Sequence, residues 1–307
     1  MYNVTIFGLE LTLDPVAFTL PIGDGWPIYW YGIIIALGFL LAIIYAMKNA
    51  HRLGVNTDKM LDVVIVTTPV AIVCARLYYI LFDPNSEGKD VSFFGSDGLS
   101  GIGIYGAVIG AFACGAIMCK IKKIKILDMF DLAAIGFIIG QGIGRWGNFM
   151  NQEAYGDFTG STWWGMTSDK IAREMGGDGL VHPCFLYESI WCIAGFFVLH
   201  YFSKKRKFSG QITLLYCIWY GFERAIVENL RTDSLMLWGP IRVSVVVSVV
   251  IFLGALIAFI LIYKKNKAVV AADNYTAMFD DGSDDFAPID INDVNDGSTE
   301  EKEETNE

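Results

Sequence analysis

Seven long apolar stretches divide this sequence, and polar linkers separate them. The stretches cover residues 28–48, 61–82, 103–121, 128–148, 184–203, 209–230 and 240–263. Each is close to the ~20 mostly apolar residues that a helix needs to cross ~30 Å of hydrocarbon. The pattern predicts an all-α polytopic membrane protein with seven transmembrane helices.

Basic residues gather in alternate linkers. Lys and Arg are concentrated at residues 48–59, 120–125, 204–207 and 264–267. The other linkers hold only Lys89, Lys170, Arg173 and Arg231. Because cytoplasmic loops contain the excess of Lys and Arg, we expect the N-terminus to lie outside and the C-terminus in the cytoplasm.

The linkers expected outside the membrane differ in length. Residues 1–27 contain Pro15, Pro21 and Pro27, which argue against a helix that continues outward. Residues 149–183 are rich in Gly and Trp and are too long for a simple connector. We therefore expect an extracytoplasmic segment at 1–27 and a small extracytoplasmic head at 149–183 on a membrane body of residues 28–263.

Composition supports this assignment and isolates the tail. Hydrophobic residues make up 54% of the chain and charged residues only 18%, against ~25% in an average soluble domain. The net charge of −10 arises at the C-terminus, where residues 268–307 contain 13 acids and one Lys. Such a composition predicts an acidic, disordered cytoplasmic tail at 264–307. We expect no nucleic-acid partner, and the six cysteines form no C-x-x-C pair that would suggest a metal site.

Ionisable residues within the apolar stretches fall in the expected outer half of the membrane. They include Arg76, Arg145, Glu188, Glu223, Arg224 and Glu228, and Tyr31 and Tyr105 begin the first and third stretches. A charged side chain near the bilayer centre costs at least ~2.5–3.5 kcal/mol on insertion scales, so a functional role is the default interpretation. The cytoplasmic halves contain almost nothing ionisable, so the pattern is one-sided.

Helical spacing arranges these residues in stripes, because residues at i, i+4 and i+7 share a face. The stripes are Gln141, Arg145 and Asn148; Tyr220, Arg224 and Glu228, continued by Arg231; and Arg76 with Tyr79. Gly136, Gly140 and Gly144 form a row of small residues that lets another helix approach closely. Two structural alternatives stay open. Arg224 and Glu228 pair with each other, or the aromatic residues at the start of the first stretch form an aromatic belt, namely Trp26, Tyr29, Trp30 and Tyr31.

The three intramembrane bases are all Arg. The planar guanidinium grips phosphate or carboxylate through paired hydrogen bonds, so the cluster indicates an anionic lipid phosphate at headgroup depth. Asn148, Asn151 and Glu153 add donors, acceptors and one possible base beside it, which suits a polyol headgroup.

Residues 144–156 read G-R-W-G-N-F-M-N-Q-E-A-Y-G. This segment resembles the pattern G-R-x-G-N-F-x-N-x-E-x-x-G of the prolipoprotein diacylglyceryl transferase family. The resemblance extends over residues 25–263 through Trp30-Tyr31-Gly32, Ala75-Arg76-Leu77, Gly103-Ile104-Tyr105-Gly106, His182-Pro183, Tyr187-Glu188 and Tyr220-Gly221.

The resemblance implies a multi-pass enzyme of the bacterial inner (plasma) membrane whose active site faces the outer leaflet. Such an enzyme transfers the diacylglyceryl group of phosphatidylglycerol to the lipobox cysteine in the signal-peptide region of a preprolipoprotein. It forms a thioether, releases glycerol 1-phosphate and needs no metal or organic cofactor.

The expected site follows from the stripes and the resemblance. We expect catalytic roles for Tyr31, Tyr105, Arg145, Asn148, Glu153 and Arg224. We expect phosphatidylglycerol to contact Arg145, Asn148, Asn151, Arg224, Arg76, Tyr220 and Glu228. In this hypothesis Arg145 holds the phosphate, with Arg224 as a second clamp.

The group that activates the thiol is left open. Many family members have a His followed by two glycines where this chain has Tyr105, and Tyr has an unperturbed pKa of ~10 against ~6.5 for His. Tyr31, Tyr105, His182 and Glu188 are the candidates. Two other classes of function, an anionic-lipid transporter or flippase and a seven-helix receptor, are less favoured, because the chain shows neither an internal repeat nor a Lys within the last apolar core.

Overall fold

The computed structural model describes residues 1–21, 25–82, 103–232, 236–238 and 241–279. Its helices are α1 (Trp30–Asn49), η1 (His51–Leu53, a 3₁₀ turn), α2 (Thr57–Phe82), α3 (Ile104–Ile121), α4 (Ile126–Asn151), α5 (Asp169–Met175), α6 (Cys184–Lys204), α7 (Gln211–Val227) and α8 (Val243–Phe279). Its strands are β1 (Tyr2–Ile6), β2 (Leu9–Leu13), β3 (Val16–Leu20), β4 (Trp26–Tyr29), β5 (Met166–Ser168), β6 (Met236–Trp238) and β7 (Ile241–Arg242).

Six described helices are long and apolar enough to cross a membrane: α1, α2, α3, α4, α6 and the part of α8 up to Lys267. They coincide with six of the seven expected stretches. The stretch at 209–230 forms α7, whose 17 residues are at the short end of what a crossing requires. The chain is a polytopic, mostly helical membrane protein.

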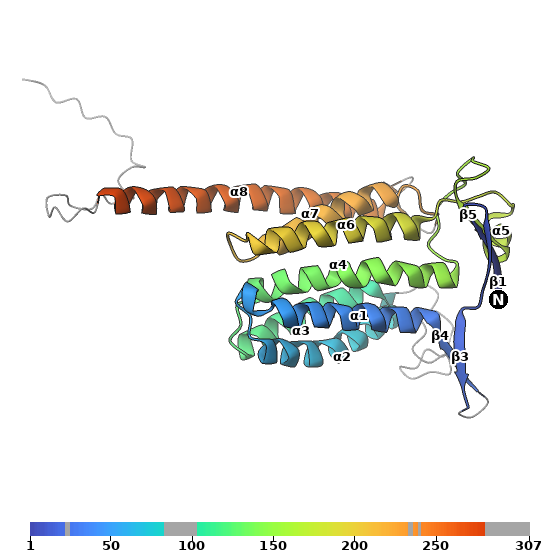
Figure 1. Cartoon of the computed structure of the whole chain (residues 1–307), viewed down its shortest axis with the longest axis horizontal. Helices are drawn as coiled ribbons and strands as arrows, with labels where there is room; N and C mark the ends of the chain where they lie inside the picture. The colour runs from blue at the N-terminus through green and yellow to red at the C-terminus, as the bar shows by residue number, and fades with distance from the viewer. Residues whose placement is uncertain (22–24, 83–102, 233–235, 239–240, 280–307) are drawn as a thin grey trace, which may run out of the picture. The chain divides into compact units, whose positions relative to one another are not determined.

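Helix α4 lies at the centre of the bundle. It packs against α1 on one side and against α6 and α7 on another (Figure 1), while α2 and α3 pair with each other. The α4 side chains Leu132, Ile135 and Ile138 are buried among these helices. By contrast, α1 buries only Gly38 among its residues, so its leucines and isoleucines face outward as they would toward lipid.

The glycine row on α4 is the surface on which α1 packs, as its spacing predicted. A Cβ atom on Gly136 would lie 3.6 Å from Ala42, and one on Gly144 would lie 3.1 Å from Ile35. A Cβ on Gly38 of α1 would lie 3.4 Å from the Cα of Gly140. The two backbones therefore approach more closely than larger residues would allow.

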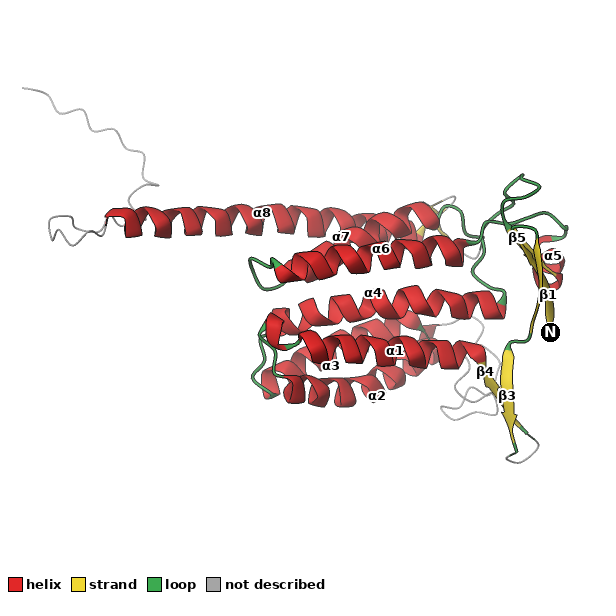
Figure 2. Ribbon diagram, in the orientation of Figure 1, coloured by secondary structure: helices red, strands yellow, loops and turns green. Residues whose placement is uncertain are grey.

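Strands appear where the pattern of apolar stretches predicted none (Figure 2). The expectation of a purely helical fold needs this correction, because short segments outside the apolar stretches pair their backbone groups in small antiparallel sheets. The prolines of residues 1–27 do prevent a helix there, and the segment forms β1 to β4 instead.

The head is built jointly by the N-terminus and residues 149–183. Strand β1 is the middle strand of an antiparallel sheet with order β2-β1-β5, and Val4 pairs with both Leu11 and Ser168. The buried core of this head comprises Val4, Phe149, Tyr155, Met166, Ile171, Val181 and Phe185. Residues 1–27 thus supply β1 and β2, two of the three strands of this sheet.

The last helix continues past the expected boundary at residue 263. Helix α8 ends at Phe279, and residues 264–279 contain several strong helix formers and neither Gly nor Pro. The remainder of the expected tail, 280–307, lies outside the described residues.

Candidate active site

A buried carboxylate joins three of the predicted charged residues at the end of the bundle next to the head. Glu188 of α6 is 1% exposed. Its Oε2 atom lies 2.8 Å from Nε of Arg145 on α4, and its Oε1 accepts a hydrogen bond of 3.0 Å from Nη1 of Arg224 on α7. A buried charge is tolerated when it is paired in this way. The three helices therefore meet at one carboxylate.

The stripe on α7 continues this network. The second terminal nitrogen of Arg224 pairs with Glu228, which also accepts a hydrogen bond from the Ser244 hydroxyl of α8. Arg231 lies 4.0 Å from Oε1 of Glu188. The pairing of Arg224 with Glu228, which the sequence left as a structural alternative, is present, and it occupies one arm of the Arg224 guanidinium.

Arg145 differs from Arg224 in how its nitrogens are used. It contacts Glu188 through Nε, and its Nη1 and Nη2 atoms donate no hydrogen bond to any residue that the structure describes. The Arg145 side chain is 19% exposed, against 1% for its Glu188 partner. Two guanidinium donors are thus held in position beside a fixed counter-charge and are available to a ligand.

The end of α4 presents a second polar group. The side-chain amides of Asn148 and Asn151 both donate to Oε1 of Glu153, at 3.0 and 3.3 Å. Glu153 is held between Gln152 and Ala154, whose φ angles of 52° and 58° lie in the left-handed region. Non-glycine residues adopt that region at a cost of about 1–3 kcal/mol, and such positions cluster at functional sites.

Tyr31, at the start of α1, lies next to these two groups. Its ring packs on Gly147, where an added Cβ would lie 2.7 Å from Cδ2 of the tyrosine. Arg145 and Glu153 are the charged residues that act on its hydroxyl through space. Tyr31 as a whole residue is 37% exposed.

His182 and Tyr187 belong to the head side of the site. The Tyr187 hydroxyl accepts a hydrogen bond from Nε1 of Trp164 at 2.8 Å and lies 3.2 Å from Nδ1 of His182. Backbone hydrogen bonds join His182 to Gly156 and Asp157. This places His182 beside the last glycine of the 144–156 segment.

Two further predicted residues, Arg76 and Tyr105, lie on the paired helices α2 and α3. Arg76 is 2% exposed, and its guanidinium lies 5.5 Å from the centre of the Tyr79 ring, as the i, i+3 spacing predicted. Tyr105 is 47% exposed, and the centre of its ring lies 6.1 Å from the centre of the Tyr78 ring. Within the described part of the chain, the Tyr105 hydroxyl makes no hydrogen bond, so no such link joins it to Arg145.

Besides Arg224, helix α7 contains the predicted residue Tyr220 and one residue that was not assigned to the site, Glu223. Tyr220 stacks on Tyr216 with ring centres 5.8 Å apart, and the Tyr216 hydroxyl accepts a hydrogen bond of 2.8 Å from Gln141 of the α4 stripe. Glu223 is 5% exposed and interacts electrostatically with Glu188, Arg145 and Arg224. A Glu inside an apolar helix is the signal that would have singled it out.

The missed residues around Glu153 have a weaker signal. Gln152 is completely buried, and its side chain donates to the carbonyl of Phe149. Nothing in the residue types Gln and Ala indicates a left-handed backbone.

Among the described residues, His, Cys, Asp and Glu side chains form no group of three or more that could hold a metal ion.

The chain is similar to known proteins over most of its length. The model of the family described as prolipoprotein diacylglyceryl transferase matches residues 15–261. A phosphatidylglycerol–prolipoprotein diacylglyceryl transferase of Clostridioides difficile (strain 630) is 41% identical over 255 residues, which cover 83% of this chain and 98% of the relative. Proteins of the same name from Bacillus cytotoxicus and Limosilactobacillus reuteri are 41% and 39% identical. They align over 85% and 84% of this chain and over 96% and 94% of their own lengths.

The matched region includes every element that forms the Arg145–Glu188–Arg224 network and the Asn148–Asn151–Glu153 group. With this coverage and identity, the chain belongs to the prolipoprotein diacylglyceryl transferase family.

Proposed function

We propose that this chain transfers the diacylglyceryl group of phosphatidylglycerol to the cysteine thiol of a prolipoprotein. The reaction forms a thioether and releases glycerol 1-phosphate. Family membership supports this proposal, as do the names of relatives that the chain matches over nearly their whole length.

The observation on which the proposal rests is the free end of the Arg145 guanidinium. Nε is fixed by Glu188, while Nη1 and Nη2 donate no hydrogen bond to a described residue. Two parallel N–H donors in one plane match two oxygens of a phosphate. Arg145 is therefore the phosphate grip, and Arg224 contributes by holding Glu188 and Glu228 rather than as an equal second clamp.

The same geometry serves the chemical step. The thiol sulfur attacks the glyceryl carbon that bears the phosphate, the carbon–oxygen bond breaks, and its electron pair passes to the leaving phosphate. The thiol proton balances the charge of the phosphomonoester that leaves. Donors that are already in position stabilise the charge that develops on a leaving group, and they act more strongly where water is excluded.

The headgroup and the thiol have separate partners in this proposal. Asn148, Asn151 and Glu153 face the glycerol hydroxyls of phosphatidylglycerol, because their amides and carboxylate are already gathered by mutual hydrogen bonds. Tyr31 orients the thiol, since it is a partly exposed residue on whose hydroxyl Arg145 and Glu153 both act electrostatically. Glu188 is occupied by guanidinium groups and acts as their anchor.

We also propose seven crossings, with α7 as the sixth of them, the N-terminus and head outside a bacterial plasma membrane, and the C-terminus inside. The alternation of basic linkers supports this orientation. It puts the Arg145 site at the depth of outer-leaflet headgroups and makes the prolipoprotein signal-peptide region the second substrate. Residues 149–183 with β1 and β2 then form the extracytoplasmic head.

The test is transfer by purified protein from labelled phosphatidylglycerol to a lipobox peptide. Arg145→Ala is expected to lower kcat by about 10²–10³, the effect of losing one such donor group. Arg145→Lys, which keeps the charge and loses the fork, is expected to restore only part of the rate. Arg173→Ala on α5 is the matched control, because Arg173 is an Arg of the head that, among the described residues, hydrogen-bonds only to a backbone carbonyl of its own helix.

Three outcomes would contradict the proposal. Near-wild-type transfer by Arg145→Ala would contradict the assignment of Arg145 as the residue that binds the phosphate. Release of glycerol phosphate from wild-type protein without a cysteine peptide would indicate a lipid hydrolase. Movement of labelled lipid between leaflets without any release would indicate a transporter.

A further inference from the structure

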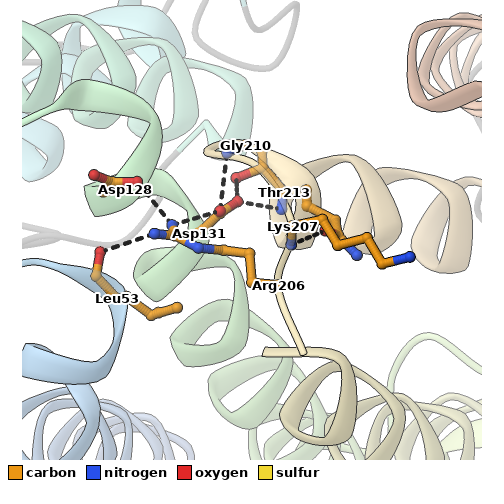
Figure 3. A network of polar contacts seen from close by, with 8 residues as sticks. Leu53, Asp128, Asp131, Arg206, Lys207, Gly210 and Thr213 are labelled. Carbon is orange, nitrogen blue, oxygen red and sulfur yellow. Dashed lines mark hydrogen bonds and ion pairs between the residues drawn. The ribbon is translucent and has the colours of Figure 1, made fainter. Parts of the chain in front are cut away.

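A second polar network lies at the opposite end of the same helices, where α7 begins (Figure 3). Asp131 of α4 is 0% exposed and accepts four hydrogen bonds. Its donors are the backbone N–H of Gly210 at 2.9 Å, the backbone N–H and hydroxyl of Thr213 at 2.8 and 2.9 Å, and Nη1 of Arg206 at 3.0 Å. Each carboxylate oxygen is thus fully used.

This carboxylate caps α7 from a neighbouring helix. The first N–H groups of a helix have no partner within it, and a side-chain acceptor normally supplies one from the preceding residue. The residue at that position is Gly210, which has no side chain to do so. Asp131 takes its place, so the start of α7 is tied to a fixed point on α4.

Arg206 links the capping residue Asp131 to other groups at the same end of the helices. Its Nη1 also donates to Asp128 of α4 at 2.7 Å, and its Nη2 donates to the carbonyl of Leu53 in η1 at 3.2 Å. Figure 3 shows the guanidinium lying between these acceptors. The cap therefore belongs to a hydrogen-bonded junction of α4, η1 and the α6–α7 connection.

The sequence distances from the cap to the two active-site arginines are equal. Arg145 is 14 residues beyond Asp131 (145 − 131) on α4, and Arg224 is 14 residues beyond Gly210 (224 − 210) on α7. At a rise of 1.5 Å per residue, each arginine is about 21 Å from the junction. Helices α4 and α7 run in the same direction from this junction. The guanidinium groups of Arg145 and Arg224 therefore reach Glu188 at the same distance along the helix axes.

We propose that Asp131 is a positioning residue for the transfer reaction, because its cap on α7 sets the axial register that brings Arg145 and Arg224 to the same carboxylate. The inference rests on the proposed function for its kinetic consequence. Its structural consequence, the register of α7 against α4, is independent of any activity.

The kinetic test compares variants with graded loss of the cap. Asp131→Ala removes every acceptor and is expected to lower kcat by about 10–10², since a displacement of 1 Å can cost about 10²-fold. Asp131→Asn keeps one acceptor oxygen, and its kcat is expected to lie between those of Asp131→Ala and wild type. KM for the lipobox peptide is expected to stay unchanged. Asp62→Asn is the matched control, because Asp62 forms an ion pair with Lys122 that involves neither α4 nor α7.

A double-mutant cycle separates positioning from general stabilisation. If Asp131 acts through Arg224, Asp131→Asn is expected to lower kcat much less in an Arg224→Lys background than in the wild type, because coupled residues are not additive. Additive effects, or a lower unfolding temperature with unchanged kcat, would overturn the proposal.

A structural readout keeps the inference testable even if transfer is absent. Spin labels replace Phe137 on α4 and Ile226 on α7, which are both exposed, in a background without other cysteines. Asp131→Ala is expected to shift or broaden the distance between the labels, and Asp62→Asn is expected to leave it unchanged. An unchanged distance in Asp131→Ala would refute the register argument, whereas wild-type protein without transfer would refute only the proposed function.

Discussion

The chemistry of the site depends on which nitrogen of each arginine is engaged. Arg224 uses both terminal nitrogens on carboxylates, and Arg145 uses only Nε. Residue type and helical spacing make the two arginines look equivalent. Their difference arises because Arg224 has a second carboxylate, Glu228, one turn along the chain, in addition to Glu188, which reaches it through the packing of α6 against α7.

The hydroxyls of Tyr31 and Tyr105 offer a comparison at the same scale. Tyr31→Phe is expected to lower kcat/KM about tenfold or more, because in the proposed function its hydroxyl orients the thiol under the charges of Arg145 and Glu153. Tyr105→Phe is expected to keep most of the activity, because its hydroxyl bonds to no described residue. Steady-state transfer to the lipobox peptide measures both. If Tyr105→Phe were the more damaging change, the thiol would have to lie on the α2–α3 side.

At the scale of elements, α1 and α4 are held together by contacts that only small residues permit. The row from Gly136 to Gly144 fits against α1, and Gly147 extends it to the Tyr31 ring. The helix–helix contact therefore also orients a side chain of the site.

Two glycines of α4 give a matched test of this coupling. Gly147→Ala places a methyl group 2.7 Å from the Tyr31 ring, which is expected to cost about 1–3 kcal/mol and to lower transfer. In Gly140→Ala the new Cβ meets nothing within 4 Å, and the higher helix propensity of Ala favours stability by about 1 kcal/mol. Thermal unfolding in detergent and the transfer assay check both variants. Equal behaviour of the two would show that Gly147 does not control Tyr31.

The sequence predicts helices better than it predicts their partners. Apolar length located six spans to within a few residues, apart from the far end of α8, and glycine spacing identified the face of α4 that meets α1. The sequence also singled out Arg145, Glu188 and Arg224, because charged residues are rare in apolar helices. Spacing within one helix could not show that Glu188 would take both arginines, nor that a strand from residues 2–6 would pair with residues 166–168. Those contacts join segments that are remote in sequence.

At the scale of the whole molecule, the path of α7 decides the number of crossings. Truncated fusions to alkaline phosphatase, which is active only outside the cytoplasm, test it. With seven crossings, a fusion after Lys207 is expected to be inactive, one after Thr232 active, and one after Lys267 inactive. Green fluorescent protein at the same three positions is the control and should fluoresce in the opposite pattern. If α7 does not cross, the last two positions exchange their results.

The pairing of β1 with β5 also affects the order in which the protein is built. Asn3 and Asp169, which flank this pair and bond to each other, are 166 residues apart. At about 5–20 residues per second, a ribosome needs roughly 10–30 s to make the intervening chain. During that time β2 is the one of its two described sheet partners that has already been made, while α1 to α4 enter the membrane. The head therefore closes after the first four spans are inserted, and until then the β1 edge that later receives β5 is open to other chains or to chaperones.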